Sequence, residues 1–209
     1  MGLEVRDGLC RSWDRLADLF ALDPRNFPKG LIGSESGPLL IVGCGRNVWE
    51  EVNGLPENRH VMAVNDMGMY WPGYVRHWYS NDVYKLVHWA QGRRDRHVHL
   101  YGKPERLHSC FSRGTAPGVY HWPFPGQGSS GLVSILVALA LGYDPITIAG
   151  LPFDNSGHFY DPPNGHNLSK GAPWSNFEAE TPDRLLERSA PLMRGKVRAL
   201  SGRLRGYLD

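Results

Sequence analysis

The sequence predicts an α/β protein built on one Rossmann-like, doubly wound and mostly parallel sheet, with a short lid-like segment. Continuous apolar runs such as 38–42 are typical of parallel strands that are buried on both faces. Helical patterns and glycine-containing turns separate these runs, as expected for consecutive β-α-β units. At 209 residues, the chain fits a single α/β domain over 1–209, in which residues 161–180 form the lid-like loop.

The composition indicates a cytoplasmic protein without a membrane segment. The formal net charge is +2, which argues against a strong electrostatic binder of nucleic acid or membranes but leaves local basic patches open. Cys10, Cys44 and Cys110 form no CxxC pair, so neither a structural zinc site nor a disulfide framework is expected. The amino terminus does not resemble a signal peptide, and the apolar run 132–141 is too short to cross a bilayer.

The chain begins with a helical pattern and then enters the sheet. Residues 9–22 carry apolar side chains at three- and four-residue spacings, which predicts an amphipathic helix. A loop rich in Pro, Gly and Ser over 24–38 leads to the first strand, 38–42. The turn 43–47 follows directly, and a helix is predicted over 48–52.

The turn Gly43-Cys44-Gly45 is the first candidate for ligand binding. Glycines at a strand-to-helix turn let backbone amides approach a phosphate, and the helix amino terminus adds partial positive charge. A tight turn without a ligand explains the same spacing, so both interpretations stay open. The dinucleotide fingerprint needs a small residue three positions after Gly45, where this chain has Val48, which argues against NAD.

Polar residues end the next two predicted strands. The strand 60–64 is followed by Asn65-Asp66, and the strand 75–79 by Ser80-Asn81-Asp82. Asp82 also fits the N-cap of a helix over 83–91, and Asn65 fits an Asx-turn. The carboxyl ends of parallel strands share one edge of a sheet, so we expect these side chains to lie near the glycine turn.

The region from 92 to 127 has the least regular pattern. Residues 97–101 alternate between polar and apolar, which predicts a strand on the edge side of the sheet. His97 and His99 would share one face of that strand, where a solvated edge is favoured over a metal pair. Residues 107–127 contain several prolines and glycines and are expected to be irregular.

The stretch 128–160 is the centre of the predicted site. It opens with Ser129-Ser130-Gly131, continues as an apolar helix that breaks at Gly142, and leads into a strand over 146–149. Ligands of open parallel sheets bind beyond the carboxyl ends of strands and at helix amino termini. Both the serine-containing start and the loop from Gly150 onward are therefore expected to face one pocket.

The carboxyl-terminal part completes the predicted sheet. Thr181 fits an N-cap and Pro182 the first position of a helix that runs to about residue 193. A short strand over 196–200 and a closing helical turn over 202–208 follow. This end is locally basic, which is typical of a solvated face and leaves contact with a polyanion as the alternative.

Spaced blocks between residues 39 and 160 resemble the bacterial sialyltransferases that use CMP-activated sialic acid. They also resemble the wider superfamily, which includes flagellin-modifying Maf-type proteins and 6-hydroxymethylpterin pyrophosphokinase-like proteins. The blocks are LLIVGCGRN at 39–47, VMAVND at 61–66, WYSND at 78–82, GSSG at 128–131, LALGYDPITIAGLPF at 139–153 and NSGHFY at 155–160.

The resemblance implies a Rossmann-like sheet, a nucleotide donor and group transfer without an obligatory metal. It implies that the glycine turn lies under the donor phosphate and that a helix amino terminus binds the donor. It also implies that the Tyr160 hydroxyl stabilises the leaving phosphate. Together with the strand-end and helix-start argument, the donor-binding residues expected are Gly43, Cys44, Gly45, Asn47, Asn65, Asn81, Ser129, Ser130, Gly131, Gly150 and Asp154.

The sequence departs from the family pattern at two places. Pro152 stands where the family has an acidic residue, and Asp154 where it has a second leaving-group tyrosine. The family's general-base histidine would fall near 174–177, where this chain has none. His166 and His158 are the alternative candidates, because deprotonation of an acceptor hydroxyl needs a group that titrates near neutrality.

The leading hypothesis is a nucleotide-sugar-dependent glycosyltransferase with a CMP- or UDP-type donor and a hydroxyl-bearing acceptor. A modified nucleobase in DNA is an alternative acceptor, suggested by the basic carboxyl-terminal segment. A pyrophosphokinase-like phosphoryl transferase is the second hypothesis and would require Mg²⁺ held by carboxylates. A nucleotide-binding module without catalysis is the third. The carboxylates available to hold Mg²⁺ are Asp66, Asp82, Asp154 and Asp161.

Overall fold

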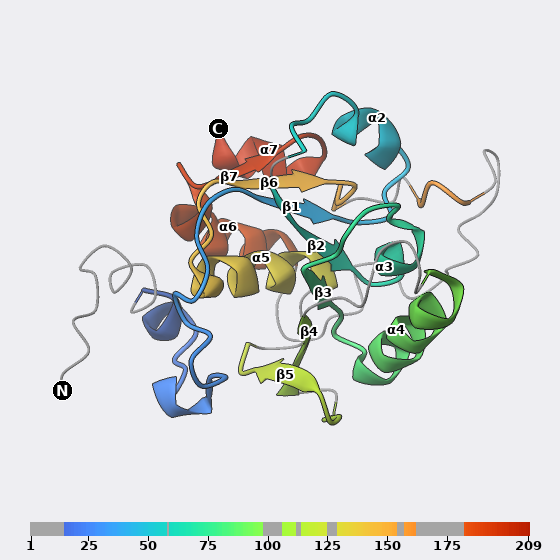
Figure 1. Cartoon of the computed structure of the whole chain (residues 1–209). Helices are drawn as coiled ribbons and strands as arrows, with labels where there is room; N and C mark the ends of the chain where they lie inside the picture. The colour runs from blue at the N-terminus through green and yellow to red at the C-terminus, as the bar shows by residue number, and fades with distance from the viewer. Residues whose placement is uncertain are drawn as a thin grey trace.

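The computed structural model describes residues 15–57, 59–97, 106–111, 114–124, 129–153, 157–161 and 182–209. It confirms the α/β prediction, with a single sheet of seven strands in the order β5-β4-β3-β2-β1-β6-β7 (Figure 1). All neighbouring strands are parallel. The strands are β1 (Leu39–Val42), β2 (His60–Val64), β3 (His77–Tyr79), β4 (Arg106–Cys110), β5 (Val119–Trp122), β6 (Ile146–Ala149) and β7 (Val197–Ala199).

Helices cover both faces of the sheet (Figure 1). Besides a helical stretch over 15–19, the helices are η1 (Pro24–Asn26), α2 (Val48–Val52), α3 (Met67–Tyr70), α4 (Val83–His97), α5 (Ser130–Leu141), α6 (Pro182–Met193) and α7 (Arg203–Leu208). Side chains of α5, α6 and α7 belong to one hydrophobic cluster. Side chains of α2, α3 and α4 belong to the cluster on the other face.

The central strand shows why the apolar runs form a sheet that is covered twice. Leu39 and Ile41 of β1 pack into the cluster that contains α5, whereas Leu40 and Val42 pack into the opposite cluster. Successive side chains of a strand point to opposite faces, so a strand buried on both sides needs apolar residues at every position. The run 39–42 meets this need, and all four residues are buried.

Helix α5 begins and ends where the sequence predicts. The Ser129 side chain accepts hydrogen bonds from the amides of Gly131 and Leu132, which caps the helix amino terminus. Gly142 at the other end has φ +102°, the left-handed conformation that glycine adopts readily. Every residue from Gly131 to Leu141 is buried, so α5 is a core helix.

The strand order reverses at β1. From β1 the chain adds β2 to β5 on one side, and it returns to place β6 and β7 on the other. The carboxyl ends of β1 and β6 therefore form the topological switch point, where open α/β sheets bind ligands. In the sequence, these ends are Gly43 and Gly150.

Two strands contradict the prediction that 107–127 is irregular. β4 and β5 both lie in or beside this region and add to the sheet in parallel with β3. Both strands carry histidine and other polar residues, and therefore lack the continuous apolar run by which a buried parallel strand is recognised. Among the strands that the structure describes, β5 forms this edge of the sheet.

The predicted strand 97–101 is wrong at its first residue, because His97 is the last residue of α4. The helix was expected to end at Gln91, before Gly92. A glycine within a helix costs only about 1 kcal/mol relative to alanine, and the next residue secures the helix. The buried Arg93 donates hydrogen bonds to the carbonyls of Trp71, at 3.0 Å, and Gly73, at 2.7 Å.

Other predicted elements agree in part or closely with the structure. The predicted helix over 9–22 is helical over 15–19, and its residues 9–14 lie outside the described residues. The strand over 196–200 and the helix over 202–208 correspond to β7 and α7. Asp82 caps α4, because its Oδ1 accepts a hydrogen bond of 3.1 Å from the Lys85 amide. Residues 162–181, which include most of the lid-like loop and the predicted cap Thr181, lie outside the described residues, as do residues 98–101.

Candidate functional site

Gly43 and Gly150 let the ends of β1 and β6 touch at the switch point. The Gly43 amide donates a hydrogen bond of 2.9 Å to the Ala149 carbonyl. A Cβ on Gly43 would lie 2.5 Å from the Gly150 carbonyl oxygen, and a Cβ on Gly150 would lie 2.3 Å from the Gly43 oxygen. Gly150 also has φ +64°. Close backbone contact thus requires glycine at both positions, whatever binds nearby.

The segment 157–161 is attached to the glycine turn. Gly45 forms an antiparallel bridge with His158, and the Phe159 amide donates a hydrogen bond of 2.9 Å to the Cys44 carbonyl. The predicted catalytic residues His158 and Tyr160 are therefore fixed beside the turn. The structure brings these two parts of the predicted site together.

Asp66 joins the glycine turn to Tyr160. The Tyr160 hydroxyl donates a hydrogen bond of 2.5 Å to Asp66 Oδ2, and the Cys44 thiol donates one of 3.2 Å to Asp66 Oδ1. Asp66 precedes α3, but its carboxylate makes no capping hydrogen bond there. Sequence reasoning placed Asp66 at the end of a strand and named it as a possible Mg²⁺ ligand, but gave it no part in donor binding.

The two donors to Asp66 are protonated at neutral pH. Partial burial, with the hydrogen bond to Asp66, raises the pKa of the Tyr160 hydroxyl above its ordinary value. Burial also raises the pKa of the Cys44 thiol, and the nearby Asp66 carboxylate adds to this effect. The hydroxyl and the thiol can therefore act as hydrogen-bond donors to an anion.

Hydrogen bonds continue this chain of predicted residues toward α5. The Ser80 hydroxyl donates a hydrogen bond of 3.0 Å to Asn65 Oδ1. The Asn81 amide donates one of 3.1 Å to Ser130 Oγ, and its side-chain Oδ1 accepts one of 2.7 Å from the Tyr79 hydroxyl. The ends of β2 and β3 and the start of α5 are thus linked along one edge of the sheet.

The amino terminus of α5 already has partners within the protein. Ser129 Oγ accepts hydrogen bonds from Gly131 at 3.0 Å and Leu132 at 3.4 Å. A ligand that binds these amides would have to replace Ser129 Oγ as their acceptor. Binding of the donor by Ser129, Ser130 and Gly131 stays a prediction.

An aromatic group surrounds Tyr160. The His158 ring stacks on the Tyr160 ring with centroids 5.1 Å apart, and the Tyr70 ring stacks on it at 5.4 Å. Nδ1 of His158 lies 3.4 Å from Oδ2 of the buried Asp161. This carboxylate also accepts a hydrogen bond of 2.7 Å from the His158 amide. A histidine backed by a carboxylate therefore stands beside the predicted leaving-group tyrosine.

Two other predicted site residues, His166 and Asp154, lie outside the described residues. Asn47 is exposed at the start of α2, where its side chain makes no capping hydrogen bond. Among the described residues, no three His, Cys, Asp or Glu side chains are grouped as a metal site would require.

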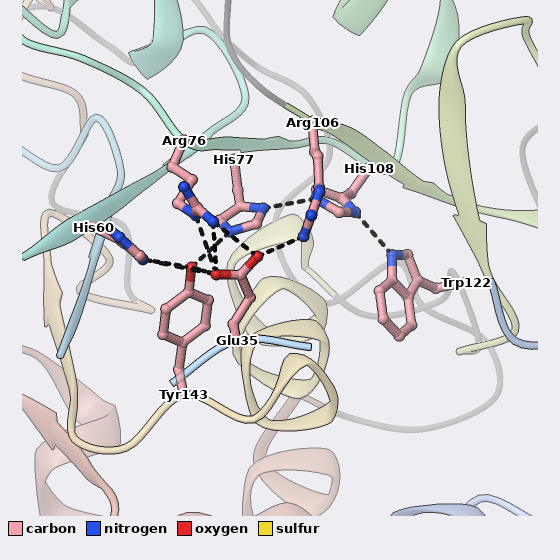
Figure 2. Close-up of polar contacts among 8 residues, drawn as sticks. All are labelled: Glu35, His60, Arg76, His77, Arg106, His108, Trp122 and Tyr143. Atoms are coloured by element: carbon pink, nitrogen blue, oxygen red, sulfur yellow. Dashed lines mark hydrogen bonds and ion pairs between the residues drawn. The ribbon is translucent and has the colours of Figure 1, made fainter. Parts of the chain in front are cut away.

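A second polar cluster extends from the first residues of β2, β3 and β4 to Trp122, the last residue of β5, and sequence reasoning missed it (Figure 2). At its centre the buried Glu35 binds two guanidinium groups. Arg76 donates from Nε at 3.1 Å and from Nη2 at 3.2 Å, and Arg106 donates at 2.5 Å. His60, whose side chain is about two-fifths exposed, lies 3.9 Å from the same carboxylate.

Donor and acceptor chemistry fixes the direction of a hydrogen-bond chain in this cluster (Figure 2). The indole of Trp122 can only donate, so the 3.1 Å bond makes His108 Nδ1 an acceptor. His108 Nε2–H then donates to His77 Nδ1 at 2.9 Å. His77 Nε2–H donates to the Tyr143 hydroxyl at 2.8 Å, and Tyr143 donates to Glu35 at 3.1 Å.

Both histidines of this chain are neutral. Burial, with the neighbouring His108 and the two arginines, lowers the pKa of His77 to about 2. Burial and Arg106 lower the pKa of His108 to about 3. A protonated His108 would also lose its acceptor nitrogen and leave the Trp122 donor without a partner. The chain is therefore a fixed structural element that does not titrate near neutral pH.

The parallel sheet, the strand order and the helices on both faces define a Rossmann-like α/β protein. The chain is similar to CstII from Campylobacter jejuni in complex with the substrate analogue CMP-3FNeuAc, with 17% identity and a TM-score of 0.57. This match covers 82% of this chain and 85% of that one. A structure of CstII with a trisaccharide acceptor and CMP matches with 13% identity and a TM-score of 0.56, over 82% and 84% of the two chains.

These similarities show the fold, and at such low identity they show no more than the fold. No protein-family model and no curated protein sequence matches the chain.

Within the described residues, no helix is long and apolar enough to cross a membrane.

Proposed function

We propose that this protein is a glycosyltransferase that takes a sugar from a nucleotide-sugar donor and transfers it to a hydroxyl group of an acceptor. The fold supports the proposal, since the similar CstII structures contain CMP-3FNeuAc in one case and CMP with a trisaccharide acceptor in the other. The observation that carries the proposal is the contact of Tyr160 with Asp66 and of Asp66 with Cys44 at the switch point of the sheet.

In the proposed reaction, the acceptor oxygen attacks the anomeric carbon and its proton passes to a histidine imidazole. The bond between the anomeric carbon and the phosphate oxygen breaks, and its electron pair stays on the phosphate. The Tyr160 hydroxyl donates a hydrogen bond to that oxygen and stabilises the developing charge. To do so, it exchanges its present acceptor, Asp66, for the phosphate.

His166 and His158 are the candidates for the base. In-line displacement needs the base and the leaving-group partner on opposite sides of the anomeric carbon. His158 stacks directly on Tyr160, so it lies on the leaving-group side. This argument favours His166 as the base and leaves His158 beside the phosphate.

Ligand binding tests the class of donor. Thermal shifts are measured with CMP, CDP, UDP, GDP, ATP and NAD, each with and without Mg²⁺. Stabilisation by CMP or UDP without metal supports sugar transfer, because a ligand that binds only the folded state raises its stability. Stabilisation only by ATP with Mg²⁺ would favour the phosphoryl transferase instead. No shift with any nucleotide would contradict the proposal.

Release of nucleotide from CMP- and UDP-sugars tests the site. We expect Tyr160→Phe and Ser130→Ala to slow turnover about tenfold or more, because each removes a hydroxyl assigned to the donor. Tyr120→Phe is the matched control, since Tyr120 is 39% exposed and Tyr160 40% exposed, and Tyr120 lies on the edge strand β5. Activity like that of the wild type in both site variants would refute the assignment.

A further inference from the structure

The glycine amides that were candidates for phosphate binding already donate hydrogen bonds within the protein. Gly43 donates to Ala149 at 2.9 Å, and Gly45 donates to the Gly150 carbonyl at 2.8 Å. The Gly150 amide donates at 2.8 Å to the Glu51 carboxylate. These three amides are therefore engaged, and a cationic side chain at this edge can supply the charge that attracts a phosphate.

Arg46 is the cationic side chain next to this turn. It follows Gly45 directly, and its Nη2 lies 3.2 Å from the position that a Cβ on Gly157 would take. Gly157 begins the short segment that carries His158 and Tyr160 and is attached to the turn. The guanidinium therefore reaches from the glycine turn to the segment with the proposed leaving-group residue.

Building on the proposed function, we propose that Arg46 binds the phosphate of the donor at this edge, beside Tyr160. A guanidinium is always charged, and its planar group of donors matches phosphate oxygens. Tyr160 and Cys44 then act as neutral donors near the same oxygens. Sequence reasoning placed Arg46 within the turn but gave it no role, because the glycines accounted for the motif.

Nearby carboxylates allow two possible roles of Arg46 to be distinguished. Asp161 Oδ2 lies 3.0 Å from the same Gly157 Cβ position, so it is close to the guanidinium. Asp66 lies at the other end of the Tyr160 hydrogen bond. If Arg46 serves only to balance Asp161, then loss of either residue has the same effect on binding. If Arg46 serves the phosphate, loss of the carboxylate leaves nucleotide binding unchanged or makes it tighter.

The test compares CMP with cytidine by isothermal titration calorimetry. Both ligands share the base and ribose, and only CMP carries phosphate. We expect Arg46→Gln to weaken CMP binding by about tenfold to a hundredfold, as for the loss of a charge-assisted hydrogen bond. Cytidine binding is expected to stay the same. Arg25→Gln is the control for the change of charge, because Arg25 is 89% exposed and pairs locally with Asp23.

Three outcomes would overturn the role of Arg46. They are unchanged CMP affinity in Arg46→Gln, an equal loss for cytidine and CMP, and a loss in Asp161→Asn as large as that in Arg46→Gln. Titration with inorganic pyrophosphate separates this inference from the proposed function. Pyrophosphate binding that depends on Arg46, without any CMP binding, would keep the phosphate site and refute the nucleotide-sugar donor. Binding of neither ligand would refute both.

Discussion

The buried pair His77 and His108 makes the folded state sensitive to acid. Their pKa values of about 2 and about 3 lie well below the value of about 6.5 for histidine in an unfolded chain. Between these values the unfolded chain binds protons that the folded protein does not, so the free energy of unfolding falls as the pH falls below about 6.5. From pH 6.5 to 5.5, linkage gives a loss of about 1 kcal/mol for each histidine, or about 2 kcal/mol for the pair.

Urea unfolding followed by circular dichroism at pH 7.5, 6.5 and 5.5 measures this loss. The expected figure depends only on both pKa values lying well below 5.5, and the range stays above the ordinary pKa of carboxylates. The matched control is the double variant His77→Gln/His108→Gln, which should lose most of the pH dependence whatever its overall stability. Constant stability of the wild type from pH 7.5 to 5.5 would refute the reasoning. So would a histidine of this pair that titrates near pH 6.5 by NMR.

The other predictions concern stability and are also measured by urea unfolding. Gly150→Ala should cost about 2 to 4 kcal/mol, because the new side chain meets both a left-handed backbone and a backbone clash. The control is Gly54→Ala, which should cost about 1 to 2 kcal/mol, because Gly54 has φ +78° but open space around it. Equal losses would contradict the close contact of β1 and β6. Arg93→Met should cost about 2 to 4 kcal/mol, because it leaves buried carbonyls without donors, and Arg93→Lys should recover part of that loss if the charge and one bond matter. Glu35→Gln should cost about 3 to 5 kcal/mol, because it removes the buried carboxylate that pairs with two partly buried guanidinium groups. A loss below 1 kcal/mol would show that solvent compensates the arginines.

The elements that could be predicted are those whose sequence carries a local signal. Strand β1 has an uninterrupted apolar run, β6 is apolar except for Thr147, and α5 has a serine cap and a glycine at its end. Each of these signals lies within a few residues, so it can be recognised without knowledge of the fold. The order of the strands has no such local signal, and only the structure shows it.

Strands β4 and β5 could not be predicted because their polar side chains are satisfied by distant residues. His108 of β4 and Trp122 of β5 are fully buried and bind one another at 3.1 Å. In the sequence they are fourteen positions apart, within a region rich in proline and glycine, and they indicate a loop. A buried polar residue costs little when a partner is present, and only the tertiary structure shows the partner.

The same reason explains the parts of the candidate site that were missed. The polar strand ends predicted that Asn65 and Asn81 lie on one edge, and the structure links these ends by hydrogen bonds. Asp66 and Arg46 stood next to predicted site residues but gained importance only through contacts with the segment 157–161. The position of that segment depends on its pairing with the glycine turn, which no local pattern encodes.

Strand β3 connects the buried hydrogen-bond chain with the candidate site, although it has only three residues. Its first residue, His77, belongs to the neutral hydrogen-bond chain. Trp78 donates at 2.5 Å to the carbonyl of Asn65, and Tyr79 donates at 2.7 Å to Asn81, so both bind residues of the candidate site. All three side chains are fully buried. Since a close-packed interior transmits displacement, a substitution that breaks the chain at His77 should also disturb the asparagines at the other end. Strand β3 thus joins the hydrogen-bond chain to residues of the candidate site, and a site needs such fixed neighbours if its side chains are to hold a productive geometry.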